Sequence, residues 1–160
     1  MDTHLRFTLV KNLKKDTHMS NILKGLLFFI LLYLISDFFV KYFTIGLLPD
    51  ALLFSFMGNE EEYIEPMGIA SFLELWHTEI FFIMMILLTL SAIYIRVVSN
   101  VKHYKFTLNV VMISALISLV SLPLAFYVSQ NFIYIYFITY FLWHLGAIKM
   151  TLRSLWKLYA

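Results

Sequence analysis

The chain contains no cysteine, and this absence excludes several kinds of chemistry at once. A protein without cysteine has no disulfide bonds, no thiolate ligands for an iron–sulfur cluster, no covalently attached haem and no thiol nucleophile. Any redox role therefore requires a cofactor that binds without a covalent bond to the protein.

Charged residues are also scarce. Asp, Glu, Lys and Arg make up 14% of the 160 residues, against about 25% in an average soluble domain, whereas 61% of the residues are hydrophobic and 18% are aromatic. This composition predicts an integral membrane protein with a single membrane domain over residues 1–160. A chain of this length has room for four spans and short connections, so we expect no soluble catalytic module, no catalytic residues and no binding to nucleic acid.

Four long apolar stretches predict the fold. A membrane helix needs about 20 apolar residues to cross a hydrocarbon core of about 30 Å. The sequence predicts a basic tail at 1–20, spans at about 21–45, 75–97, 106–128 and 132–152, and an acidic outer loop at 49–74 with short interfacial helices. The expected fold is an all-α, four-helix antiparallel bundle with up-down-up-down topology.

Basic and acidic residues fall on opposite sides of this arrangement. Eleven of the 12 Lys and Arg residues lie on one side, and Lys41 is the exception. Six acidic residues lie on the other side: Asp50, Glu60, Glu61, Glu62, Glu65 and Glu74. Because basic segments next to membrane spans stay in the cytoplasm, both termini are predicted to be cytoplasmic and the protein to lie in the inner (plasma) membrane.

Three helix starts are predicted from local residues. Ser20 is placed to cap the first span, and Asp50 is placed to cap a short helix over 51–57. The alternative for 51–57 is a continuation of the first span beyond a kink. Pro66 suits the first position of a further helix over 67–74. The glutamates between these segments predict a solvated acidic turn, with binding of a hard cation or a basic partner as the alternative.

Two ionisable residues, Asp37 and Lys41, interrupt the apolar part of the first span. They are four positions apart and so share one helix face. Intramembrane ionisable groups usually face a bundle interior or a water-filled cavity, which predicts a functional polar site; a self-neutralising pair with Lys41 reaching toward the interface is the alternative. His77 and Glu79 also lie toward the outer surface and complete the candidate site. The two are about 200° apart around an ideal helix, which argues against a joint metal site.

His144 in the fourth span is the candidate residue for a cofactor site. Four-helix membrane cytochromes hold haem b between histidines on facing helices, and His103 is the nearest partner in depth for such a pair. Tyr140 and Trp143 supply aromatic surface of the kind that lines haem and quinone pockets. The alternative is a core histidine that is hydrogen-bonded across the bundle.

The third span carries a stripe of small residues at helical spacing: Thr107, Ser114, Ser118, Ser121 and Ala125. Such stripes let two helices approach closely and form hydrogen bonds across the contact. Pro123 lies in the same span and leaves the carbonyl one turn earlier without its helix partner. We expect serine hydroxyls or water to satisfy that carbonyl, and a bend in the helix near it.

No motif in the sequence names a reaction. The predicted function is therefore that of an accessory subunit, assembly factor or scaffold of a larger membrane complex. Its expected partners are the lipid bilayer and other membrane subunits, or further copies of the same chain. The first alternative is an electron carrier with haem b or a quinone at His144. The second is a small ion or proton transporter or channel that uses Asp37, Lys41 and Glu79.

Overall fold

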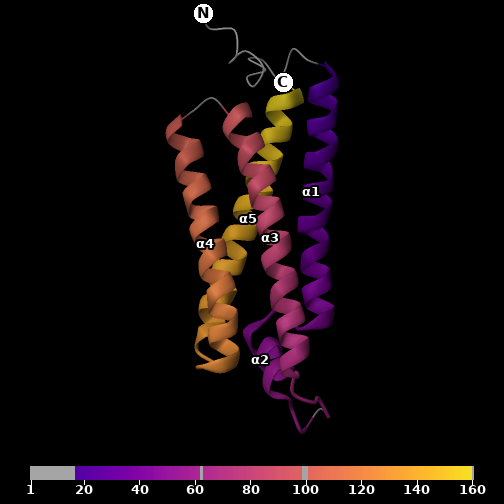
Figure 1. The fold of residues 1–160 in the computed structure, drawn as a ribbon, viewed down its shortest axis with the longest axis vertical. Helices are drawn as coiled ribbons and strands as arrows, with labels where there is room; N and C mark the ends of the chain where they lie inside the picture. The colour runs from indigo at the N-terminus through magenta and orange to yellow at the C-terminus, as the bar shows by residue number, and fades with distance from the viewer. Residues whose placement is uncertain (1–16, 62, 99–100, 160) are drawn as a thin grey trace, which may run out of the picture.

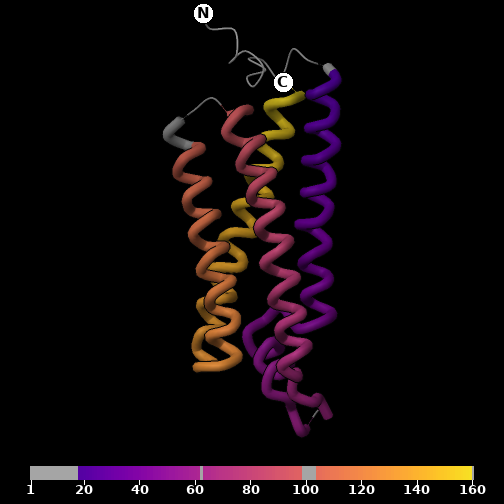
Figure 2. Tube along the Cα trace, viewed as in Figure 1, coloured from indigo at the N-terminus to yellow at the C-terminus, as the bar shows by residue number. Residues whose placement is uncertain are grey.

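The computed structural model describes residues 17–61, 63–98 and 101–159, and all regular structure in these ranges is helical (Figure 1; Figure 2). The helices are α1 (Thr17–Thr44), α2 (Pro49–Met57), α3 (Ile69–Val97), α4 (Val101–Tyr127) and α5 (Phe132–Tyr159). The described ranges contain no β-strand, only an isolated bridge between Asn59 and Ile64. The all-α prediction is confirmed. Residues 1–16 of the predicted basic tail lie outside the described residues.

Four of the helices, α1, α3, α4 and α5, are long and apolar enough to cross a membrane, which confirms the four predicted spans. Each helix extends beyond its predicted span at one end, by four to seven residues. The reason is that hydropathy marks only the apolar core, whereas backbone hydrogen bonding continues into the interface. Successive spans run in opposite directions, so α1 begins and α5 ends at the same end of the bundle (Figure 1).

Helix α5 is the centre of the bundle. It packs against each of the other four helices, and α1 and α4 lie on either side of α3 and α5 (Figure 1). Its inner face has side chains that are 4% exposed or less: Ile133, Tyr136, Tyr140, Trp143, His144, Ala147 and Met150. These residues recur at three- and four-residue intervals, the spacing of one helix face. Several of them carry a hydroxyl group or a ring nitrogen, and such polar groups need hydrogen-bond partners when buried.

Glycine is required where α4 meets α5, the largest interface in the bundle. A Cβ atom at Gly146 would lie 2.4 Å from Cγ2 of Val111, and Val111 is fully buried. Valine is β-branched, so its side chain cannot easily rotate away. The absence of a side chain at Gly146 therefore sets how closely the two helices approach.

We expect Gly146→Ala to lower the thermal stability of the protein in detergent. Alanine has a higher helix propensity than glycine by about 1 kcal/mol, but overpacking a buried contact typically costs about 1–3 kcal/mol. The loss of helical circular dichroism on heating measures the net effect. Adding Val111→Ala makes room for the methyl group, so the double variant should melt above Gly146→Ala. A single variant that melts at or above the wild-type temperature would contradict the close contact.

The turn between α1 and α2 depends on Gly46 and Ser55. Gly46 has a φ of 83°, in the left-handed region where glycine commonly ends a helix. The Ser55 hydroxyl donates a 2.7 Å hydrogen bond to the carbonyl of Ile45 and so ties α2 to the end of α1. Helix α2 starts at Pro49, so the prediction that Asp50 caps it is wrong. Asp50 lies in the first turn instead, where its charge suits the helix dipole.

Two other predicted helix starts are wrong. Ser20 does not cap α1, because it lies inside the helix and its side chain is buried. Pro66 does not start a helix, because α3 has Gly68 as its N-cap. The chain after Pro66 is held against α2 by a hydrogen bond of 3.2 Å, which the N–H of Met67 donates to the carbonyl of Ser55.

Helix α2 covers one end of the bundle with apolar side chains. We call this end, which also carries the acidic turn after α2, the loop end. Leu52 and Phe56 are its buried residues. The ring of Phe56 packs edge-on against Phe72 of α3 at 5.7 Å and Phe126 of α4 at 5.4 Å, centroid to centroid. Phe72 and Phe126 stack on each other at 4.1 Å. These aromatic contacts join three helices and close the core on this side.

An exposed acidic turn follows α2. Asn59 and Ile64 exchange two backbone hydrogen bonds of 2.9 Å across it. The three described glutamates of the turn are exposed: Glu60, Glu61 and Glu65. Glu62 lies outside the described residues. The arrangement is that of the solvated acidic turn expected from the sequence.

The stripe of small residues on α4 lies inside the bundle. Its buried members are 3% exposed or less: Ser114, Ser118, Ser121 and Ala125. Thr107 is partly buried. Because α4 packs against α5 and α3, the buried part of the stripe is used within the chain and does not face a partner protein. The Ser114 hydroxyl donates to the carbonyl of Val110 in its own helix at 2.6 Å, not across the helix contact.

Pro123 lies inside α4 without ending the helix. Proline has no N–H, so the carbonyl of Leu119, four residues earlier, lacks its helical donor. The indole Nε1–H of Trp76 in α3 donates a 2.9 Å hydrogen bond to this carbonyl. The predicted serine or water partner is therefore replaced by a tryptophan of the neighbouring span, and this contact joins α3 to α4.

Candidate functional site

A buried ion pair connects α1 to α3. The Lys41 ammonium donates a hydrogen bond to Oε1 of Glu79, and the two side chains are each 9% exposed. Tyr136 of α5 completes the contact, because its hydroxyl accepts a 2.9 Å hydrogen bond from Lys41 and donates one of 3.2 Å to Glu79. Each of the three helices thus supplies one member of a closed group of hydrogen bonds.

A second polar contact lies about one turn away, around Asp37. The Tyr140 hydroxyl donates a 2.9 Å hydrogen bond to Oδ2 of Asp37. The ring of His144 lies beside the same oxygen, with Nδ1 at 3.7 Å, and its other nitrogen, Nε2, is 2.6 Å from the carbonyl of Leu34. Because a carbonyl only accepts hydrogen bonds, Nε2 carries the proton and donates. His144 is therefore bonded across the bundle from α5 to α1.

The two contacts form one cluster. The Lys41 ammonium lies 4.9 Å from the centre of the Tyr140 ring and 5.7 Å from that of Tyr136, within the range of cation–π attraction. The two tyrosine rings stack at 5.8 Å. We call Asp37, Lys41, Glu79, Tyr136, Tyr140 and His144 the ionic cluster.

The cluster lies toward the loop end of the bundle. Lys41 is three positions before the end of α1, and Tyr136 is four positions after the start of α5. Toward the opposite end the core is filled by apolar side chains that are fully buried, including Leu27, Leu90 and Met150. Charged groups with so little exposure are stabilised mainly by their partners.

Of the four residues predicted for an intramembrane polar site, the structure brings together Asp37, Lys41 and Glu79 and leaves out His77. His77 is exposed on another face of α3, as its angle of about 200° from Glu79 requires. The described residues contain no group of three or more His, Asp or Glu side chains arranged to hold a metal ion.

The haem prediction for His144 does not fit this geometry. Its Nε2 is already used in the hydrogen bond to α1. The rings of Phe38, Trp143 and Tyr140 pack around the imidazole, with centroids 4.2, 4.8 and 5.1 Å from its own. The side chain of His103, the predicted second ligand, lies outside the described residues. His144 has the geometry of the alternative, a core histidine bonded across the bundle.

Tyr136 is the member of the cluster that the sequence did not single out as a site residue. A usable signal was present, because Tyr136, Tyr140 and His144 repeat at four-residue intervals on one face of an apolar span. Two tyrosine hydroxyls and a histidine ring on one buried face need polar partners from neighbouring helices. Asp37, Lys41 and Glu79 are those partners.

The helices and the cluster define a small multi-pass membrane protein with a buried polar cluster toward one end of the bundle. Residues 46–160 match the family model Aq_1264_TM, a transmembrane helical domain, and the chain belongs to this family. The matched region includes Glu79, Tyr136, Tyr140 and His144, whereas Asp37 and Lys41 precede it. No curated protein and no solved structure significantly matches the chain.

Proposed function

We propose that the protein acts as an accessory subunit, assembly factor or scaffold of a larger membrane complex, without a reaction of its own. The observation that carries this proposal is that the ionisable groups of the interior bond to one another, Lys41 to Glu79 and Asp37 to Tyr140. Groups in such a closed cluster hold helices in register. Most of their donors and acceptors are used inside the bundle, which supports a structural role over a catalytic one.

The proposed location is the inner (plasma) membrane, with both termini in the cytoplasm. Basic residues gather at the end of the bundle where α1 begins and α5 ends: Lys24, Arg96, Lys105, Lys149, Arg153 and Lys157. Acidic residues gather at the other end: Asp50, Glu60, Glu61, Glu65 and Glu74. The positive-inside rule supports this orientation.

The outer face of α1 supports a role in binding partners. Helix α1 packs mainly against α3 and α5, so much of its surface faces outward. That surface carries phenylalanines that are more than half exposed: Phe28, Phe29, Phe39 and Phe43. Within a membrane, such rings contact lipid or pack against the helix of another subunit.

The proposal is tested by crosslinking the tagged full-length protein in intact membranes of its native host and purifying it gently. We expect a discrete species larger than the 18.9 kDa chain, with other membrane proteins present in a fixed ratio. Asp37→Asn keeps an oxygen that accepts from Tyr140, so this variant should retain the assembly. A chain that crosslinks only to itself or to nothing would contradict the proposal.

Proton or cation transport is the second candidate, and the charge of the cluster favours it. Asp37, Glu79 and Lys41 leave one net negative charge when His144 is neutral. Oε2 of Glu79 and Nδ1 of His144 also have no hydrogen-bond partner among the described residues. A transporter would give a proton or cation flux in proteoliposomes that Glu79→Gln abolishes. A subunit without transport activity would give no flux above that of protein-free liposomes.

A further inference from the structure

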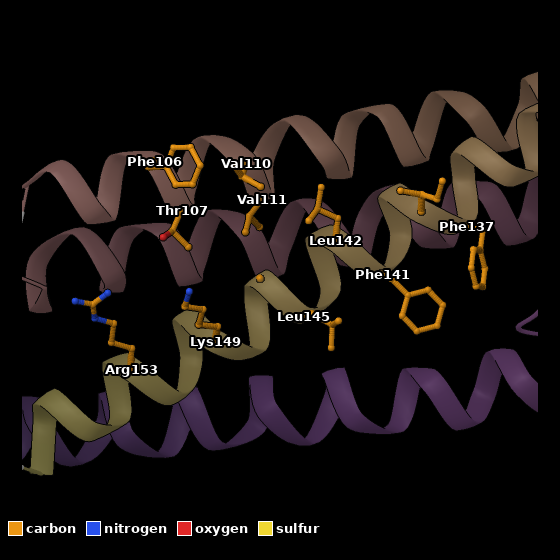
Figure 3. Close-up of a pocket in the computed structure, with 12 residues that line it drawn as sticks. Phe106, Thr107, Val110, Val111, Phe137, Phe141, Leu142, Leu145, Lys149 and Arg153 are labelled. Atoms are coloured by element: carbon orange, nitrogen blue, oxygen red, sulfur yellow. The ribbon is translucent and has the colours of Figure 1, made fainter.

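A groove runs along the outside of the bundle between α4 and α5, away from the ionic cluster (Figure 3). Its volume is about 990 Å³. Most of its lining is apolar, with Val110 and Val111 from α4 and Phe141, Leu142 and Leu145 from α5. Gly146 also lines the groove, and a Cβ atom at this position would clash with Val111.

Two basic side chains lie at one end of this groove. Lys149 and Arg153 are four residues apart on α5, so they share one helix face. Figure 3 shows both of them at the end of the groove near Thr107, with Phe137 at the opposite end. Among the residues that the structure describes, no acidic side chain lines the groove and no carboxylate forms an ion pair with either cation.

The position of these cations along α5 suits contact with a lipid headgroup, because the fourth span predicted from the sequence ends at about residue 152. They lie ten and six residues before the end of α5, in the half of this helix that shares its side of the bundle with Arg96 and Lys105. From Arg153 to Phe137 the groove is roughly 24 Å long at about 1.5 Å per residue, which exceeds the roughly 15 Å of one leaflet. An acyl chain that starts at the headgroup level can therefore lie along the apolar part.

We propose that this groove binds an anionic phospholipid, with the phosphate between Lys149 and Arg153 and an acyl chain against Leu145, Leu142 and Phe141. Basic pockets between membrane helices on the headgroup side suit anionic lipids. The two cations, which pair with no described carboxylate, favour a phospholipid over an apolar partner helix, because such a helix would bury them without a counter-ion.

The test is native mass spectrometry of the delipidated full-length protein in detergent, titrated with palmitoyl-oleoyl phosphatidylglycerol and, separately, with the phosphatidylcholine of the same chains. We expect the anionic lipid to bind with affinity about tenfold or more above the zwitterionic one. Lys149→Gln/Arg153→Gln should lower the affinity for phosphatidylglycerol about tenfold or more, because both charges are lost.

Three further variants keep the proposal falsifiable. Lys157→Gln/Arg96→Gln removes two cations from the same end of the bundle but outside the groove, and should change the affinity less than about threefold. Lys149→Arg/Arg153→Lys keeps both charges and should retain binding. Leu145→Trp fills the apolar part and should weaken binding although the cations remain. Equal affinity for the two lipids, an equal loss in the control pair, or a second copy of the chain as the bound species would overturn the proposal.

Discussion

Lys41→Met should lower the free energy of unfolding in detergent by about 3–5 kcal/mol, the effect of leaving a buried charge without its partner. The variant removes the ammonium that bonds to both Glu79 and Tyr136. Methionine keeps most of the volume of the lysine stem, so a cavity does not explain the loss. What remains is a carboxylate that is 9% exposed and bonded only to one hydroxyl.

Equilibrium unfolding in a mixed detergent series, followed by circular dichroism, measures this effect. Lys157→Met is the matched control, because Lys157 lies in the last turn of α5, far from the ionic cluster. The control should change the free energy of unfolding by no more than about 0.5 kcal/mol. If Lys41→Met is as stable as this control, the ion pair does not hold α1 to α3.

Trp76→Phe should be the second most damaging change, lowering the free energy of unfolding by about 1–3 kcal/mol. Phenylalanine keeps an aromatic ring but cannot donate to the carbonyl of Leu119, which Pro123 already deprives of its helical donor. A carbonyl without a donor is especially unfavourable inside a membrane, where no water replaces the lost bond.

Two comparisons separate this hydrogen bond from the packing of the indole ring. Trp156→Phe is the control for ring size, since Trp156 is 75% exposed. Pro123→Ala restores an N–H that can donate to Leu119, so Trp76→Phe should be less harmful in that background. An equal loss with and without Pro123 would show that the indole acts through packing alone.

Hydropathy is sufficient to predict the four spans, because an apolar helix of this length has no other stable environment. Helix ends are less predictable. The sequence favours Ser20, Asp50 and Pro66 as starts, yet α1 includes Ser20 and α2 begins one residue before Asp50. These ends depend on contacts between segments, such as the hydrogen bond from Met67 to Ser55, which no local pattern contains.

The candidate site could also be predicted only in part. Asp37, Lys41 and Glu79 stand out as charges within apolar spans, and the helical angle already separates His77 from Glu79. The sequence treats His144 and Tyr140 as a separate cofactor site because it does not reveal how α5 is rotated in the bundle. The structure turns that face toward α1, so the two predicted sites become one cluster.

The most direct measurement of the structural role of the cluster uses a variant without its charges, Asp37→Asn/Lys41→Met/Glu79→Met/Tyr136→Phe. The three groups that bond to one another at Lys41 are removed together, and asparagine at position 37 keeps an oxygen that accepts from Tyr140, so no charge is left without a partner. Replacing a buried ionic group as a whole is often neutral or stabilising. We predict that this variant unfolds at a temperature close to that of the wild type and is recovered from native membranes in the same assembly. A variant that folds normally but is no longer recovered in the assembly would contradict the account, because the charges would then have a function beyond holding the helices together.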